Sequence, residues 1–191
     1  VLDGVPVALD IALSPNEARI GVEADAALTP RAKALLDDAL LNILGLRIDP
    51  APFLKAAQND PLLGDAVQRN AGLRIVQSAT IFEALTWAII GQQINLSFAI
   101  ALRRTFILQA GRQHSNGLWC YPEAADVSKL SVDDLTTRKF SRSKAETLLR
   151  LAQLVDGGSL SLERTADIEA ASAQLLAVKG IGPLTVNYAL L

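Results

Sequence analysis

The spacing of hydrophobic positions changes near residue 30 of this chain. Before that point, apolar and polar residues roughly alternate over 5–13 and 18–24, and a turn-forming stretch at 14–16 lies between them. A period of two predicts strands, here a β-hairpin. After residue 30 the apolar positions recur every three or four residues, which predicts helices. The fold class is therefore expected to be mainly α, or α+β overall, with a small β-rich N-terminal domain.

Capping residues indicate where several of these helices begin and end. Thr29 and Pro30 are typical of an N-cap and a first helical position, and Gly45 can end the helix that follows. The apolar stripe of that helix consists of Leu35, Leu36, Ala39, Leu40, Ile43 and Leu44. Thr80 and Glu83 form a capping-box pattern before an apolar helix. The remaining sequence predicts helices over 52–59, 61–71, 82–90, 96–110, 123–129, 131–136, 141–155 and 166–177, with a loop over 111–122.

We place one domain boundary after residue 45. Residues 1–45 are expected to form the β-rich N-terminal domain with one helix, and residues 46–191 a helical domain. Half of the 191 residues are hydrophobic, so a sizeable core can form, and no apolar run approaches the roughly 20 residues that span a bilayer. Neither a signal peptide nor a membrane partner is expected.

Cysteine usage indicates the compartment. The single cysteine, Cys120, excludes an internal disulfide and is typical of a reducing environment. We expect a cytoplasmic monomer, associated with the nucleoid if the protein is bacterial. The chain contains no methionine and its last residues continue a helical pattern, so it is expected to be a fragment of a longer protein.

The charge is nearly balanced but unevenly distributed. A formal net charge of −2 excludes a generally basic nucleic-acid coat. Residues 1–100 carry 7 Lys and Arg against 11 Asp and Glu, whereas residues 101–191 carry 11 against 9. The positive charge is concentrated in Arg138, Lys139, Arg142, Lys144 and Arg150. This group is either a solvated helix face or part of a surface that faces phosphates.

The chemistry of the chain is concentrated in its last fourteen residues, 178–191. Gly180 and Gly182 allow backbone conformations and close approaches that a side chain would forbid. Pro183 suits the first turn of a helix, and a helix N-terminus presents free amides that bind anions such as phosphate. The spacing alone would also fit an ordinary turn between two helices. The residues predict a backbone-mediated grip on DNA.

The wider pattern resembles a known family. The sequence LLAVKGIGPLTVNY over 175–188 is similar to the helix-hairpin-helix of the DNA glycosylase superfamily, which includes endonuclease III and the alkylbase glycosylases. FEALTWAIIGQQINL over 82–96 resembles the corresponding helix of 3-methyladenine DNA glycosylase II, about ninety residues upstream as in that family. Residues 141–150 also resemble the helix before the hairpin. The resemblance covers roughly 44–191 and agrees only in kind with the β-rich start.

The resemblance implies roles for the hairpin residues. Gly180, Gly182 and Thr185 would face the DNA phosphates, and such contacts position the protein without reading sequence. No cofactor would be required, although backbone carbonyls in the hairpin would hold a monovalent cation, namely those of Leu176, Val178 and Ile181.

The resemblance also implies a role for the two consecutive glutamines. Gln92 and Gln93 would enter the minor groove and fill the gap that a flipped base leaves, which lowers the cost of flipping. The alternative interpretation is that both glutamines merely interrupt a surface helix.

Position 184 restricts the reaction that the resemblance implies. Family members that also cut the DNA strand carry a lysine there as a Schiff-base nucleophile, so Leu184 excludes a lyase reaction through this position. The alkylbase branch often carries a tryptophan that stacks on the damaged base. Leu184 would supply only an apolar wall to the base pocket, and Lys179 is not in register to replace the missing lysine.

The function implied is that of a monofunctional DNA glycosylase acting in base excision repair. It would bind duplex DNA containing damaged bases, flip out alkylated purines of the 3-methyladenine type and remove them hydrolytically. The family's catalytic aspartate would lie beyond Leu191, so no catalytic residue is assigned and residues 1–191 alone are expected to be inactive. The alternative is a non-catalytic helix-hairpin-helix protein that binds duplex DNA.

Other chemically capable residues are expected to have structural roles. Three carboxylates out of register should be helix caps or surface charges, namely Asp133, Asp156 and Asp167. His114 stands alone in a polar loop and Cys120 has no partner cysteine, so neither supports a metal site. Trp87 lies on an apolar helix face and is expected in the core, with base stacking as the alternative. Trp119 and Tyr121 pack under the loop or line a cleft.

Overall fold

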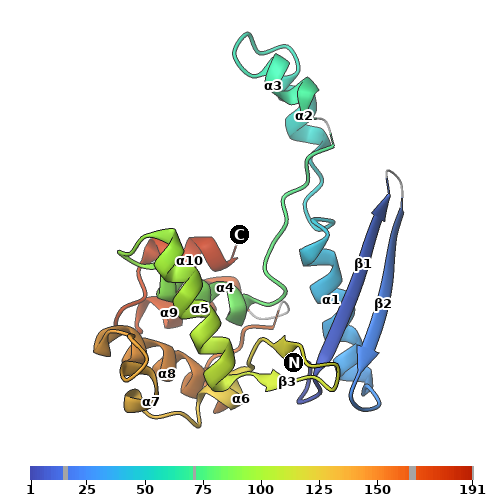
Figure 1. Ribbon diagram of the computed structural model, residues 1–191. Helices are drawn as coiled ribbons and strands as arrows, with labels where there is room; N and C mark the ends of the chain where they lie inside the picture. Colours follow the sequence, from blue (N-terminus) through green and yellow to red (C-terminus); the bar gives the residue numbers. More distant parts are fainter. Residues whose placement is uncertain (15–16, 71, 164–166, 191) are drawn as a thin grey trace.

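The chain is mainly helical, with a two-stranded antiparallel hairpin at its N-terminal end (Figure 1). The computed structural model describes residues 1–14, 17–70, 72–163 and 167–190. Strands β1 (Val7–Ser14) and β2 (Glu17–Ala24) pair along their whole length, from Val7 opposite Ala24 to Ser14 opposite Glu17. The predicted fold class is confirmed, while the turn residues 15 and 16 lie outside the described residues.

The helices follow the predicted order. They are α1 (Pro30–Ile43), α2 (Ala51–Ala57), α3 (Gly64–Arg69), α4 (Ile81–Gly91), α5 (Leu96–Ala110), α6 (Ala124–Val127), α7 (Val132–Thr136), α8 (Arg142–Asp156), α9 (Ile168–Leu176) and α10 (Pro183–Leu190). Each overlaps a helix expected from the sequence. The predicted limits at residues 71 and 166 lie outside the described residues. Figure 1 shows α2 and α3 as an arm that projects away from the other helices.

One predicted loop is wrong. Within residues 111–122, strands β3 (Arg112–Gln113) and β4 (Trp119–Cys120) pair antiparallel. Gly117, with φ of +90°, provides the left-handed residue that the tight turn between them requires. Strands of two residues are too short to produce an alternating pattern, so the hydrophobic period did not reveal them.

Local capping sets the helix starts as expected. Thr29 Oγ1 accepts a hydrogen bond from the amide of Ala32, and Thr80 Oγ1 accepts one from the amide of Glu83. The carboxylate of Glu83, however, forms an ion pair with Arg103 of α5. The capping-box glutamate therefore joins α4 to α5, because a charged partner on a neighbouring helix competes with a backbone amide for the same oxygens.

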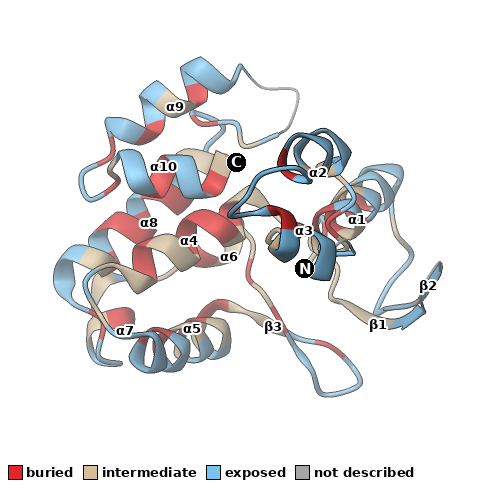
Figure 2. Cartoon of the chain, turned by 90° about the horizontal axis from the view of Figure 1, so that it is seen from above, coloured by how far each residue is buried: buried red, intermediate tan, exposed pale blue. Residues whose placement is uncertain are grey.

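The main core lies between α4, α5, α8, α9 and α10. Its fully buried side chains include Leu85, Ile89, Phe106, Leu148, Leu151 and Leu175. Figure 2 shows the buried residues of α4 and α8 gathered where these helices meet. A smaller cluster of Leu2, Ala32 and Leu36, with Val7 and Leu9 against it, joins the hairpin to α1. The buried apolar surface of these clusters is the main source of stability.

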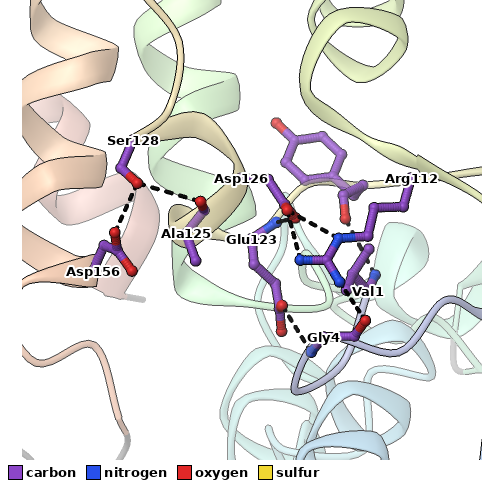
Figure 3. A network of polar contacts seen from close by, with 9 residues as sticks. Val1, Gly4, Arg112, Glu123, Ala125, Asp126, Ser128 and Asp156 are labelled. Carbon is purple, nitrogen blue, oxygen red and sulfur yellow. Dashed lines mark hydrogen bonds and ion pairs between the residues drawn. The ribbon is translucent and has the colours of Figure 1, made fainter.

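A polar network attaches the N-terminal segment to the helical part (Figure 3). Arg112 of β3 donates to the carbonyl of Gly4 and, through Nε and Nη2, to Asp126 Oδ1 at 2.9 and 2.7 Å. Glu123 Oε2 accepts a hydrogen bond from the amide of Gly4 at 3.0 Å. The side chain of Asp126 is only 8% exposed, and the Arg112 guanidinium is its ion-pair partner.

His114, expected in a polar loop, packs into the protein. The side chain is buried, and its Nε2 lies 3.2 Å from the carbonyl oxygen of Glu23 and 3.3 Å from Asp25 Oδ1. A hydrogen bond from Ser115 lowers the pKa of the Asp25 carboxyl. The β3–β4 hairpin therefore contacts β2, which lies about ninety residues earlier in the chain and could not be paired with it from sequence.

Among the residues that the structure describes, no helix combines the length and hydrophobicity needed to cross a membrane.

Replacing Arg112 by alanine tests the importance of this junction. The buried Asp126 carboxylate and the Gly4 carbonyl would lose their donor, so Arg112→Ala should lower the free energy of unfolding by about 2 kcal/mol in urea titrations. The control is Arg31→Ala, since the Arg31–Glu163 pair is 69% and 64% exposed. Exposed pairs contribute little, so this variant should lose less than about 0.5 kcal/mol. Equal losses in both variants would contradict the assigned role of Arg112.

Candidate nucleic-acid interface

The two segments singled out by the sequence lie against each other. The side-chain amide of Gln92, at the end of α4, donates through Nε2 to the carbonyl of Gly180 at 3.0 Å and to Thr185 Oγ1 at 3.1 Å. These partners are 88 and 93 residues away in sequence. The structure thus brings the glutamine turn and the glycine hairpin onto one surface.

The glycine hairpin has its shape because of Gly180. Its φ is +94°, and a Cβ at this position would lie 2.3 Å from Thr147 Oγ1 of α8. Either constraint alone disfavours a side chain. Gly182 differs, since a Cβ there would meet nothing within 4 Å. The first glycine therefore serves packing inside the protein, whereas the second leaves the surface open for an approaching group.

The N-terminus of α10 follows directly. Pro183 occupies its first position, and the amides of a first helical turn have no partner inside the helix. Leu184, expected in the base pocket, is 84% exposed, and Tyr188, one turn later, is 52% exposed. The sequence interpretation did not assign Tyr188 a role, although the spacing of four residues places it on the face of Leu184.

Thr185 does not point outward. It is 5% exposed, and its hydroxyl accepts the hydrogen bond from Gln92. Its side chain therefore faces the α4 turn, and its backbone amide belongs to the first turn of α10.

The two glutamines point to different surroundings. Gln93 has φ of +55°, a left-handed conformation, and its side chain is exposed. The turn ends at Asn95, whose side chain accepts a hydrogen bond from the amide of Phe98 and caps α5. The left-handed residue reverses the chain between α4 and α5, so neighbouring side chains diverge.

Helix α8 forms hydrogen bonds to both the glutamine turn and the glycine hairpin. The sequence interpretation did not predict these bonds. Lys144 Nζ donates to the carbonyl of Ile90 at 2.7 Å, and Thr147 Oγ1 lies 3.0 Å from the carbonyl oxygen of Lys179. Desolvation lowers the pKa of Lys144. The only available sequence signal was the position of Lys144 within the basic group, where Arg142 pairs with Glu146. Part of that group therefore binds within the protein.

The predicted cation ligands lie in the hairpin turn. Val178 and Ile181 are buried, and the Val178 carbonyl accepts a hydrogen bond from the amide of Ile181 at 3.0 Å. A carbonyl oxygen has a second lone pair, so this bond leaves capacity for a cation. Leu176 is 46% exposed at the end of α9. Within the described residues, no group of three His, Cys, Asp or Glu side chains could hold a metal ion.

The remaining residues take structural positions. Asp167 caps α9, Asp156 accepts a hydrogen bond from Ser128, and the buried Cys120 lies with its Sγ 3.6 Å from the Val7 carbonyl oxygen. Trp87 is half-buried, with the guanidinium of Arg103 5.4 Å from its ring centroid.

Tyr121 packs inward. Its hydroxyl lies 2.7 Å from Thr86 Oγ1, and burial raises its pKa to about 12.

Alanine substitutions should separate the two glycines of the hairpin. Gly180→Ala forces a side chain into a left-handed residue and against Thr147, and should cost about 2 kcal/mol of unfolding free energy. Gly182→Ala, in open space, should change it by less than about 0.5 kcal/mol. Thermal and urea unfolding of both variants measure the difference. A Gly180→Ala protein as stable as Gly182→Ala would show that the hairpin does not require this close contact.

The chain resembles several known proteins, although no protein-family model matches it. A DNA-3-methyladenine glycosylase of Bacillus subtilis (strain 168) is 34% identical over 148 residues, or 75% of this chain. The chain spans about half of that relative, 49% of its length. The solved structure of a 3-methyladenine DNA-glycosylase from Archaeoglobus fulgidus has a TM-score of 0.79 at 28% identity. The match covers all of this chain and 65% of the Archaeoglobus chain.

A third protein shares the fold alone. The Schizosaccharomyces pombe 3-methyladenine DNA glycosylase, solved with abasic DNA, has a TM-score of 0.56 at 20% identity. The match covers 72% of this chain and 67% of the yeast chain. The likeness to the Archaeoglobus protein covers the whole chain, so it includes both the glutamine turn and the glycine hairpin. The chain belongs to the helix-hairpin-helix DNA glycosylase superfamily, in the branch that contains the 3-methyladenine glycosylases.

Proposed function

We propose that the protein is a monofunctional DNA glycosylase that flips out alkylated purines of the 3-methyladenine type and removes them hydrolytically in base excision repair. The relatives named for this activity support the proposal. The observation that carries it is the contact of Gln92 with Gly180 and Thr185, which places the glutamine turn beside the hairpin. A phosphate grip and a groove-entering turn are the two parts that base flipping requires.

The hairpin is proposed to hold the DNA backbone. Gly182 leaves open space at the N-terminus of α10, where a phosphate can approach without meeting a side chain of that residue. The amides of Gly180, Gly182 and Thr185 are the proposed donors to it. A monovalent cation on the carbonyls of Leu176, Val178 and Ile181 would add positive charge next to that phosphate. Contacts of this kind hold DNA without reading its sequence, as a repair protein needs.

The turn of Gln92 and Gln93 is proposed to enter the minor groove. The exposed Gln93 projects from a left-handed residue between two helices. A glutamine side chain can fill the space of a flipped base and hydrogen-bond the orphaned partner, which offsets part of the unstacking cost. Damaged duplex DNA is the proposed partner. The protein is proposed to bind it as a monomer in the cytoplasm.

The flipped base is proposed to meet an apolar wall on α10. Leu184 is exposed there, with Tyr188 on the same face one turn away. Because position 184 carries no lysine, no Schiff base forms there and the product is an abasic site with an intact strand.

The proposed reaction requires a catalytic carboxylate, and none of the carboxylates of residues 1–191 is assigned to this role. Its role is to stabilise oxocarbenium character at the sugar or to activate water, as carboxylates do in glycoside cleavage. An alkylated purine is cationic and leaves readily, so protonation of the leaving group by a general acid is less necessary.

Base release is the direct test of the proposed activity. The full-length protein, incubated with methylated duplex DNA, should release free 3-methyladenine and leave a strand that breaks only on later alkaline treatment. Chromatography of the released bases and denaturing gels of the DNA measure both. Duplex binding without base release would overturn the enzyme in favour of a DNA-binding protein, and strand breaks before alkali would contradict the absence of lyase activity.

Gly182→Asp tests the phosphate grip. A carboxylate in the open space beside the amides of α10 repels a phosphate and fills its position, so the affinity for duplex DNA should fall at least about tenfold. Fluorescence anisotropy with labelled duplex measures it at fixed salt, with Gly182→Asn as the uncharged control of similar size. Unchanged affinity for Gly182→Asp would mean that DNA binds elsewhere.

A further inference from the structure

The structure assigns Gln92 a role different from that of its neighbour: we infer that Gln92 is a positioning residue that stays on the protein during base flipping and holds the turn of Gln93 at a fixed place relative to the phosphate grip. This inference rests on the proposed function and deepens it, because it divides a pair of glutamines into one that enters DNA and one that does not.

The first observation is the saturation of the Gln92 amide. One amide nitrogen carries two hydrogens, and Gln92 Nε2 has two acceptors, the Gly180 carbonyl at 3.0 Å and Thr185 Oγ1 at 3.1 Å. Thr185 Oγ1 belongs to a residue that is 5% exposed. Entry of Gln92 into DNA would break both bonds and leave a buried hydroxyl without this partner, which is unfavourable.

The second observation is that this contact is one side of a closed triangle. Three elements meet at the site, and each pair is joined by a side chain directed to a backbone carbonyl. Gln92 joins the end of α4 to the hairpin at Gly180, and Lys144 joins α8 to the end of α4 at Ile90. Thr147 joins α8 to the hairpin at Lys179, with its one hydroxyl hydrogen shared between the carbonyls of Lys179 and Ser143. A closed set of contacts holds relative positions better than any single contact, because no element can move without breaking two of its sides.

The third observation is the direction of Gln93. It follows Gln92 directly, has φ of +55° and is exposed. The turn between α4 and α5 is short, since α4 ends at Gly91 and Asn95 already caps α5. Fixing Gln92 therefore fixes the backbone position of Gln93, whose side chain is exposed to solvent.

The geometry of duplex DNA explains why a positioning residue is needed here. The distance from a phosphate to the gap left by a flipped base is set by the duplex, so the grip and the inserted side chain must keep a matching separation. Groups held in place before binding lose less entropy than groups that order on binding. We expect Gln92 to act on discrimination of flipped-base DNA through Gln93, and not by contact with DNA.

The experiment is a double-mutant cycle in the full-length protein. Wild type, Gln92→Ala, Gln93→Ala and the double variant are compared for affinity to an undamaged duplex and to the same duplex with an abasic-site analogue. The ratio of the two affinities measures discrimination. A 2-aminopurine base next to the abasic site reports local unstacking by its fluorescence.

The expected result is strongly non-additive. Each single variant should lose about fivefold in discrimination, as expected for lost hydrogen bonds, and the double variant should lose little more than Gln93→Ala alone. Thr185→Val, which removes only the acceptor hydroxyl at similar volume, should reproduce part of the Gln92→Ala loss. Gln92→Glu should not rescue it, because a carboxylate has no hydrogen to donate to the Gly180 carbonyl.

The outcomes are separable. If Gln93→Ala loses discrimination between the two duplexes and Gln92→Ala does not, this inference is overturned and the proposed function stays intact. Additive losses in the double variant overturn it as well, since they mean that Gln92 contacts DNA independently. Wild-type discrimination in Gln93→Ala overturns the groove-entering turn, and this inference with it. Melting temperatures of all variants distinguish a purely structural role, which would lower stability and leave the affinity ratio unchanged.

Discussion

The site depends on one close contact, the approach of Gly180 to Thr147 of α8. With φ of +94° and no room for a Cβ at Gly180, only glycine allows the hairpin to follow this path over α8. That path turns the Gly180 carbonyl toward the end of α4, where Gln92 reaches it. The same path leaves Gly182 and the start of α10 facing open space. A residue chosen for packing thus determines which backbone groups remain available outside.

Apolar and polar contacts have separate tasks in this structure. Burial of side chains such as Leu85, Phe106 and Leu148 brings α4, α5 and α8 together and provides most of the stability. Such contacts are non-directional, so they do not define the final position of a turn. Directed hydrogen bonds at the edge of the core define that position, for example the bond from Lys144 to the Ile90 carbonyl. The candidate DNA surface lies at this polar edge.

The N-terminal part uses the same principle at another junction. Arg112, which also pairs with Asp126, donates to the carbonyl of Gly4, and the buried His114 binds the carbonyl of Glu23. Both contacts come from the segment that the sequence predicted as a loop. Its two short strands place polar side chains where the N-terminal hairpin and the helical part meet, which explains why this segment is ordered without a long hydrophobic pattern.

The sequence by itself determined the local features. Thr29, Thr80 and Ser141 begin helices, and glycine and proline mark the hairpin, because capping and turn preferences act over three or four residues. The family resemblance rested on the same local motifs. Only the tertiary structure decided that Glu83 binds Arg103, that His114 is buried, and that Gln92 bonds the hairpin while Gln93 stays exposed. Those choices join residues up to about ninety positions apart, and they arise only after the apolar faces of the helices have packed.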